Sequence, residues 1–175
     1  MTIFLIGYMA SGKTTLGRAF AKANGLQFID LDFYIEQRFR KSISQIFAEE
    51  GEERFRQIER AMLREVGEFC DAVISCGGGT PCFFDNMDYM NSQGITVWLD
   101  ADIPTTTRRL LEAKGKRPIV MKLTPEQLPS FIETHLAARR PHYSKAHIRL
   151  DSNLLESRHQ IAQTIQTLQS IIDNQ

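Results

Sequence analysis

The sequence predicts an α/β fold in which helices cover a five-stranded parallel sheet. Two observations predict it. Short apolar runs alternate with helical patterns along the whole chain, and the first run leads directly into a glycine-rich turn and a helix. Alternation of this kind is required by a parallel sheet, because each crossover to the next parallel strand takes a helix. A chain of 175 residues is long enough to bury one core, so we expect residues 1–175 to form a single domain.

Five apolar runs are typical of buried strands, and polar or glycine residues follow each of them. The runs are Ile3–Ile6, Leu26–Ile29, Ala72–Ser75, Ile95–Leu99 and His147–Leu150. Apolar residues at helical spacing predict the intervening helices. They are Leu16, Ala19, Phe20 and Ala23 on the first helix, Phe55, Ile58, Met62, Val66 and Phe69 on a long one, and Ile161, Ile165, Leu168 and Ile172 on the last.

The turn after the first strand matches the phosphate-binding pattern G-x-x-x-x-G-K-[ST] from Gly7 to Thr14. Its position between a strand and a helix gives the pattern physical meaning, because backbone N–H groups and the helix N-terminus then point at an anion. Lys13 can reach the β- and γ-phosphates of a nucleotide, and the Thr14 hydroxyl can ligate Mg²⁺. The alternative is a glycine-rich turn with a surface lysine.

Polar groups also follow the second and third strands, at the sheet edge where ligands of open parallel sheets collect. Asp30 and Asp32 follow the second strand, so one could approach Mg²⁺ through water while the other accepts a proton from a substrate hydroxyl. Either could instead cap the next helix. Ser75 and Gly77–Gly79 follow the third strand. Three glycines indicate a special backbone conformation, a tight connection, or room for a ligand. Ser75 stands where many phosphate-loop enzymes carry a metal-contacting acid, which shifts that duty towards Thr14 and Asp30.

The composition excludes several classes of function. The formal net charge is zero, so the chain as a whole does not attract nucleic acid or a membrane surface. Cys70, Cys76 and Cys82 form neither a zinc pattern nor a disulfide framework and are expected to be reduced thiols in the cytoplasm. No apolar run approaches the ~20 residues of a membrane span. The first residues already form a strand, so we expect no signal peptide.

Three arginines remain ambiguous by spacing alone. Arg56 could form ordinary ion pairs on a helix surface, and Arg139 could be favoured at a helix end merely as a cation. Arg117 belongs to a polar, basic segment, residues 113–118, that suits either a lid or a plain solvated loop. An enzyme that binds a carboxylated substrate would need such guanidinium forks.

Taken together, these motifs resemble the shikimate kinase family. The matching segments, in order, are residues 7–14, Phe28–Asp32, Ile46–Glu59, Gly77–Gly79, Arg117–Pro118 and Arg139–Tyr143. The resemblance implies a three-layer P-loop NTPase fold of the nucleoside-monophosphate-kinase type, with a mobile lid at about residues 112–124. It also implies transfer of the ATP γ-phosphoryl group to the 3-hydroxyl of shikimate, in aromatic amino-acid biosynthesis. The alternatives are another P-loop small-molecule kinase, such as one for gluconate, and a nucleotide-binding regulatory module.

The resemblance assigns roles to individual residues. Asp32 would be the base, and Lys13 and Arg117 would complete the catalytic group. Arg56 and Arg139 would bind the substrate carboxylate, with Glu59 orienting Arg56. Asp32 and the backbone of Gly78 would also contact the substrate. ATP would contact Ala10, Ser11, Gly12, Lys13, Thr14, Thr15, Arg117 and Asn153.

The same resemblance implies ATP as co-substrate and one Mg²⁺ per subunit, bound by Thr14 with Asp30 and Ser75 acting through water. It implies a monomeric cytoplasmic enzyme without nucleic-acid or membrane partners. Three positions depart from the family pattern, of which His142, in place of a usual leucine, is expected to be a surface variation. Ala10 stands where a glycine is usual, and Leu110 stands where an arginine near the adenine is common, so the neighbouring Arg109 is the candidate substitute.

Overall fold

The computed structural model describes residues 1–113 and 121–174. Residues 114–120 lie outside this description, and so do Arg117 and most of the predicted lid. The strands are β1 (Thr2–Ile6), β2 (Gln27–Asp30), β3 (Ala72–Ser75), β4 (Ile95–Asp100) and β5 (Ile148–Asp151). The helices are α1 (Lys13–Asn24), α2 (Leu31–Phe39), α3 (Ile43–Gly67), the 3₁₀ turn η1 (Thr80–Cys82), α4 (Asn86–Gln93), α5 (Ile103–Glu112), α7 (Leu128–Tyr143) and α8 (Arg158–Asp173).

The five strands form one parallel sheet in the order β2-β3-β1-β4-β5. This confirms the predicted sheet, and each strand lies within a residue or two of its predicted position. The central strand β1 carries the phosphate loop, and its neighbour β3 leads into the three glycines. The register aligns Ser75 of β3 with both Leu5 of β1 and Asp30 of β2. The polar ends of three strands therefore meet at one edge of the sheet.

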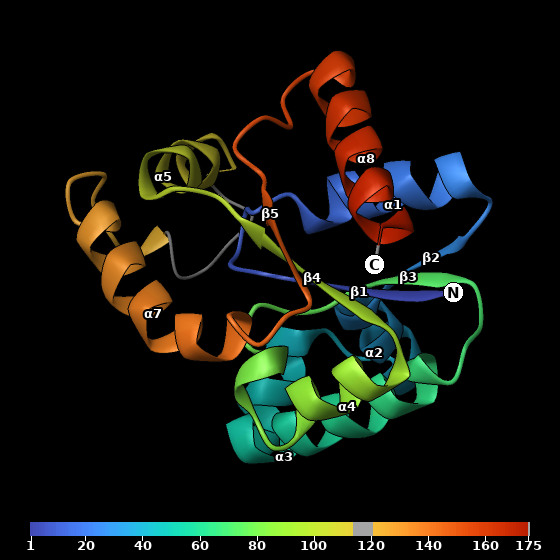
Figure 1. Ribbon diagram of the computed structural model, residues 1–175. Helices are drawn as coiled ribbons and strands as arrows, with labels where there is room; N and C mark the ends of the chain where they lie inside the picture. The colour runs from blue at the N-terminus through green and yellow to red at the C-terminus, as the bar shows by residue number, and fades with distance from the viewer. Residues whose placement is uncertain (114–120, 175) are drawn as a thin grey trace.

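Helices cover both faces of the sheet, which gives the three layers (Figure 1). The alternation of side chains along β1 explains the two cores. Ile3 and Leu5 point into a cluster with α1 and α8, whereas Phe4 and Ile6 point into a larger cluster with α2, α3, α4 and α7. In Figure 1, α5 and α7 lie beside the end of the sheet opposite the N-terminus, which is the end that carries the phosphate loop.

The predicted apolar faces of the helices are confirmed with three adjustments, the first being that Phe69 lies beyond the end of α3 at Gly67. In α1, Leu16 and Phe20 are buried as expected, but Ala23 is exposed and Gly17 and Ala21 are buried instead. Helix α1 packs closely against the sheet through Gly17, where a β-carbon would lie 2.7 Å from Phe28 Cε2. Helix α3 is interrupted at Gly51, whose φ of 81° is not helical, so its long apolar stripe begins after this break.

None of the helices in the described part of the chain is both long and apolar enough to cross a membrane.

Candidate active site

The phosphate loop forms a cradle at the end of β1. Gly12, with φ of 94°, begins α1, and Lys13 folds back over the loop. The Lys13 ammonium group donates hydrogen bonds to the carbonyl oxygens of Gly7 and Tyr8, both at 2.8 Å, and contacts Ser11 Oγ at 3.5 Å. The ammonium group is therefore held at the mouth of the cradle, where a phosphate would lie.

Ala10 adopts the left-handed conformation, with φ of 59°. This conformation costs an alanine about 1–2 kcal/mol because its β-carbon approaches the following carbonyl group. The loop thus keeps its conformation although Ala10 replaces the usual glycine. The Ala10 carbonyl oxygen accepts a hydrogen bond from Arg109 Nη1 at 3.2 Å, which holds the strained residue from outside the loop.

A set of oxygen ligands lies at the ends of β1, β2 and β3. Thr14 Oγ1 donates to Asp30 Oδ2 at 3.5 Å, and both residues line the same cavity as Ser75. Asp30 also caps α2, because its Oδ1 accepts a hydrogen bond from the Phe33 backbone N–H at 3.2 Å. The capping alternative is therefore confirmed for Asp30, while its other carboxylate oxygen faces Thr14.

These ligands suit magnesium. Hydroxyl and carboxylate oxygens are the ligands that Mg²⁺ prefers, and Mg²⁺ is usually held by one or two carboxylates together with water and substrate phosphates. The described residues contain no cluster of three or more histidine, cysteine or acidic side chains that could hold a metal by themselves. The residues present fit a cation that arrives with a phosphorylated ligand.

Asp32, in the first turn of α2, carries a perturbed carboxyl group. Its burial raises its pKa from 3.8 to about 6, and the nearby negative charges of Glu59 and Asp30 act in the same direction, against Lys13. A carboxylate with a pKa near the working pH can accept a proton and is a suitable general base. Asp32 lines the cavity that also contains Lys13.

The three glycines lie against three side chains of the site. A β-carbon on Gly77 would lie 3.1 Å from Asp32 Oδ1, one on Gly78 would lie 2.8 Å from Arg139 Nη1, and one on Gly79 would lie 2.7 Å from Arg56 Nη2. None of the three has a positive φ. Close approach, rather than a special backbone conformation, therefore requires glycine here, and the room is taken by side chains of the site itself.

Arg56 is fixed on several sides. Its Nη1 donates to Glu59 Oε2 at 2.9 Å, and its guanidinium group lies 4.0 Å from the centroid of the Phe83 ring. Glu59 is 1% exposed and also accepts a hydrogen bond from Thr80 at 2.6 Å. The Arg56 side chain is only 12% exposed. Because both Glu59 oxygens are engaged, this carboxylate holds Arg56 in one orientation.

Arg139 comes from α7 and lies beside Gly78 and the phosphate loop. Its guanidinium group is 5.6 Å from the ring centroid of Tyr8, in the phosphate loop. Tyr143, one turn further along α7, donates a hydrogen bond from its hydroxyl to the Gly78 carbonyl oxygen at 2.6 Å. Helix α7 is thereby fastened to the glycine run that separates the two arginines.

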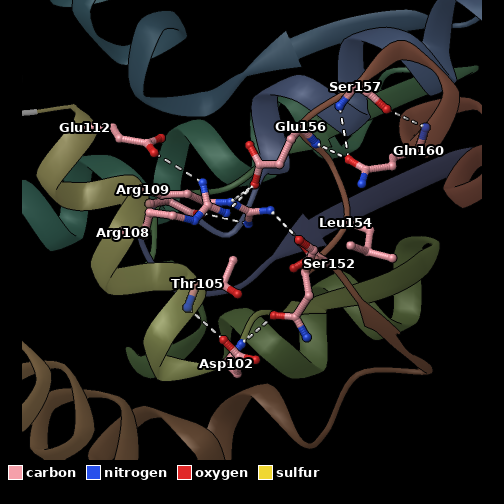
Figure 2. Close-up of polar contacts among 12 residues, drawn as sticks. Asp102, Thr105, Arg108, Arg109, Glu112, Ser152, Leu154, Glu156, Ser157 and Gln160 are labelled. Atoms are coloured by element: carbon pink, nitrogen blue, oxygen red, sulfur yellow. Dashed lines mark hydrogen bonds and ion pairs between the residues drawn. The ribbon is translucent and has the colours of Figure 1, made fainter.

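The opposite side of the phosphate loop is held by Arg109, whose contacts with Ser152 and Glu156 are drawn in Figure 2. Its guanidinium group donates to the carbonyl oxygens of Ser152, at 2.8 Å, and Asn153, at 3.2 Å, in addition to Ala10. Its Nε donates to Glu156 at 2.9 Å. Because the N–H groups bond within the guanidinium plane, the two flat faces of Arg109 carry no hydrogen bond. Leu110 is 1% exposed in the core, so the helix phase turns Arg109, and not residue 110, towards the cavity.

The cavity between these groups has a volume of about 420 Å³. The predicted residues Ala10–Thr15, Asp30, Asp32, Ser75 and Gly78 line it, and so does Arg109. Arg56 and Arg139 lie beside the glycine run and are not among the residues that line this cavity. The Asn153 side chain turns away and accepts a hydrogen bond from the Asp102 backbone N–H at 2.9 Å.

Sequence reasoning missed several lining residues, among them Met9, Cys76, Leu155 and Glu156. Leu155 and Glu156 immediately follow Asn153, so their position after β5 was the available signal. Burial raises the pKa of the Cys76 thiol, which therefore lines the cavity as a neutral group. All three cysteines are free.

The fold and the site together define a P-loop phosphotransferase, in which Arg56 and Arg139 lie beside the glycine run that adjoins the phosphate loop. The sequence matches the shikimate kinase family profile over residues 9–169. Several curated relatives carry that name. The shikimate kinase of Phocaeicola vulgatus is 52% identical over 95% of both chains, and that of Bacteroides fragilis is 49% identical over 98% of this chain and 96% of its own. The chain belongs to the shikimate kinase family.

Solved structures agree with this membership. The crystal structure of shikimate kinase from Bacteroides thetaiotaomicron has a TM-score of 0.96 at 47% identity, covering 99% of this chain and 98% of that one. The enzyme from Acinetobacter baumannii, solved in complex with shikimate, has a TM-score of 0.82 at 31% identity, covering 99% and 94%. A gluconokinase from Sinorhizobium meliloti, at 16% identity and a TM-score of 0.55, shares the fold alone.

Proposed function

We propose that this protein transfers the γ-phosphoryl group of ATP to the 3-hydroxyl of shikimate, giving 3-phosphoshikimate and ADP. One observation carries the proposal. Asp32, Arg139 and Arg56 lie against three consecutive glycines, next to the phosphate loop. This arrangement supports a proposed acceptor site in which Asp32 accepts a proton and the two arginines bind a carboxylate. The A. baumannii relative, whose structure contains shikimate, supports the choice of acceptor.

On the acceptor side, Arg56 and Arg139 bind the carboxylate of shikimate, and the Gly78 backbone contacts its ring. Both arginines already face a narrow strip of backbone, and Glu59 holds Arg56 in one orientation. Such preorganised guanidinium groups bind a planar carboxylate through paired, charge-assisted hydrogen bonds. Asp32 holds the ring hydroxyls and accepts the proton of the attacking 3-hydroxyl, which its pKa of about 6 permits at neutral pH.

On the nucleotide side, the amides of residues 10–15 and the Lys13 ammonium group bind the ATP phosphates. Arg109 and residues 153–156 border the adenine, because Arg109, Leu155 and Glu156 line the cavity beside the phosphate loop. The Arg117 side chain neutralises charge on the transferred group. This role follows from the Arg117–Pro118 motif, and loss of such an arginine lowers turnover by about 10³ or more.

Thr14 would hold the Mg²⁺ that accompanies ATP, one per subunit, with Asp30 and Ser75 acting through water. The cation supplies charge neutralisation for the phosphates when bound. The Thr14–Asp30 contact and the oxygen-only ligand set support this assignment. We also propose that residues 1–175 act as one kinase domain and as a monomeric cytoplasmic enzyme, as the resemblance to the family implies.

The direct test is ADP release, measured by a coupled assay, with shikimate, gluconate and a nucleoside monophosphate as acceptors. We expect turnover with shikimate alone. Turnover with gluconate or the nucleotide in place of shikimate would reassign the enzyme to another small-molecule kinase. ATP binding without turnover on any acceptor would indicate a regulatory module. Asp32→Asn should bind ATP normally and lose most activity, about 10²–10⁴-fold, whereas near-normal turnover by that folded variant would refute its role as base.

A further inference from the structure

Helix α7 carries one line of side chains spaced four residues apart, and the last three of them contact the phosphate loop or the glycine run. The line consists of Phe131, His135, Arg139 and Tyr143. Residues at this spacing lie on the same face of a helix. The last two members contact the glycine run, as described above. The second member, His135, contacts Tyr8 of the phosphate loop, and the proposed reaction gives it no role.

His135 is paired with Tyr8. The His135 Nδ1 atom and the Tyr8 hydroxyl share a hydrogen bond of 2.9 Å, and the two rings meet edge to face with centroids 5.4 Å apart. The Phe131 ring contacts His135 at 5.3 Å, so the imidazole is bordered by aromatic rings from the loop and from its own helix. Burial and the charge of Arg139 lower the pKa of His135. The imidazole is therefore neutral at pH 7 and able to exchange one hydrogen bond with a hydroxyl.

Tyr8 is part of the phosphate loop, and its ring also contacts Arg139, which belongs to the proposed acceptor site. Its backbone is part of the phosphate cradle, because its carbonyl oxygen accepts hydrogen bonds from Lys13, at 2.8 Å, and from the Ser11 N–H, at 3.3 Å. Its side chain is 3% exposed and lies with its ring under the guanidinium group of Arg139, 5.6 Å away. The place of the Arg139 guanidinium group relative to the phosphate loop therefore depends on the position of the Tyr8 ring.

We propose that His135 is a positioning residue that, by holding the Tyr8 ring, sets the place of the Arg139 guanidinium group relative to the phosphate loop. This inference rests on the proposed function, in which Arg139 binds the carboxylate of the acceptor. An aromatic ring attracts a cation over its face, so a ring that is held in one orientation also holds the cation. A group that positions substrate loses effect when it moves by a fraction of an ångström.

The test compares His135→Leu, Tyr8→Phe and the double variant. Leucine is close to histidine in size but cannot form a hydrogen bond, and phenylalanine keeps the ring of Tyr8, so both substitutions remove the hydrogen bond with little change in volume. We expect the KM for shikimate and its Kd, measured by calorimetry without nucleotide, to rise about three- to tenfold, as for the loss of one positioning hydrogen bond. The kcat and the KM for ATP should stay within about twofold, because the loss falls on acceptor binding alone. The double variant should be no worse than either single one.

Two further variants separate positioning from simple loss of structure. His135→Asn places an amide group close to the site of Nδ1 and should restore shikimate affinity to within about twofold of the parent. His159→Leu makes the same substitution at an exposed position of α8 as His135→Leu, and should leave all constants unchanged. Thermal unfolding of each variant shows whether it is folded.

Three results would overturn the inference: unchanged shikimate affinity in His135→Leu and Tyr8→Phe, additive effects in the double variant, or equal losses for ATP and shikimate. Failure of the proposed function looks different. If the parent protein does not phosphorylate shikimate, or if Arg139→Gln binds shikimate normally, the acceptor assignment itself is wrong, whatever the His135 variants do.

Discussion

The guanidinium group of Arg139 lies against the backbone of Gly78, where an added β-carbon would stand 2.8 Å from Nη1. Gly78 has a backbone conformation that other residues adopt, since its φ is not positive. The residue is therefore glycine because a side chain from α7 needs the space. This relationship joins two segments that lie far apart in sequence, and it leads to the first prediction.

Gly78→Ala should displace Arg139 without unfolding the protein, because the obstructing atoms belong to the far end of a flexible side chain. We expect the KM for shikimate to rise about tenfold or more, as for the loss of a charge-assisted hydrogen bond. The KM for ATP should change little. Steady-state kinetics with each substrate varied in turn measures both, and an equal rise in both constants would contradict the argument.

The pH dependence of activity should report the carboxyl group of Asp32. Its raised pKa, about 6, means that the carboxylate becomes protonated as the pH falls through that value and can then no longer accept a proton. We expect kcat/KM for shikimate to decline below about pH 6. A profile measured from pH 5 to 8 would show this limb, and a flat profile across that range would exclude Asp32 as the base.

The same group should lower the stability of the folded protein at neutral pH. Its carboxylate is harder to ionise in the folded state than in the unfolded chain, where its pKa is near 3.8. The cost is absent below that value and complete above about pH 6. We therefore expect Asp32→Asn to raise the free energy of unfolding by about 1–3 kcal/mol at pH 7.5.

Urea unfolding of both proteins at several pH values measures this difference. The advantage of Asp32→Asn should shrink towards zero as the pH falls to 4. A stability difference that is independent of pH would show that packing, rather than ionisation, separates the two proteins.

Substitutions of Arg109 and of its neighbour Arg108 form a matched pair that tests the proposed nucleotide site. Both donate to Glu156, but the Arg109 side chain is 10% exposed and faces the cavity, whereas that of Arg108 is 46% exposed. We expect Arg109→Ala to raise the KM for ATP by about five- to tenfold with the KM for shikimate unchanged. Arg108→Ala should alter neither constant, since an exposed ion pair contributes little. Equal effects of the two substitutions would argue against a specific role of Arg109.

Ala10→Gly should stabilise the protein. The left-handed φ of 59° is strained for alanine and free for glycine, and this gain exceeds the greater flexibility of glycine in the unfolded chain. We expect a gain of about 0.5–1 kcal/mol and a rise in Tm of about 1–4 °C. Scanning calorimetry measures it. A lower Tm would mean that contacts of the Ala10 methyl group outweigh the strain.

Several parts of the fold could be predicted because they depend on neighbouring residues. The phosphate loop is one contiguous segment, and alternation between β1 and α1 is visible in local periodicity. Asp30, Asp32 and Ser75 were expected at one edge because parallel strands bring their carboxyl ends together, and the register of β2 and β3 does align Asp30 with Ser75. The phase of α1 was less predictable, because burial of Gly17 depends on how closely the helix approaches the sheet.

Other features depended on residues that are distant in sequence. Spacing alone left Arg56 and Arg139 as surface cations or anion ligands, and only packing brought them to adjacent glycines. Arg109 lines the cavity because α5 packs with Leu110 in the core, and this orientation of the helix depends on tertiary packing. The Tyr8–His135 pair spans 127 residues, and no local pattern signals it.

The sequence by itself determined the sheet, the phosphate cradle and the family of this protein, because periodicity and contiguous motifs record interactions between near neighbours in the chain. Tertiary structure alone decided which side chains fill the space beside the glycines and what holds α7 to the phosphate loop. Those outcomes follow from the packing of elements on one sheet, where a shift of one helical position exchanges a buried residue for an exposed one.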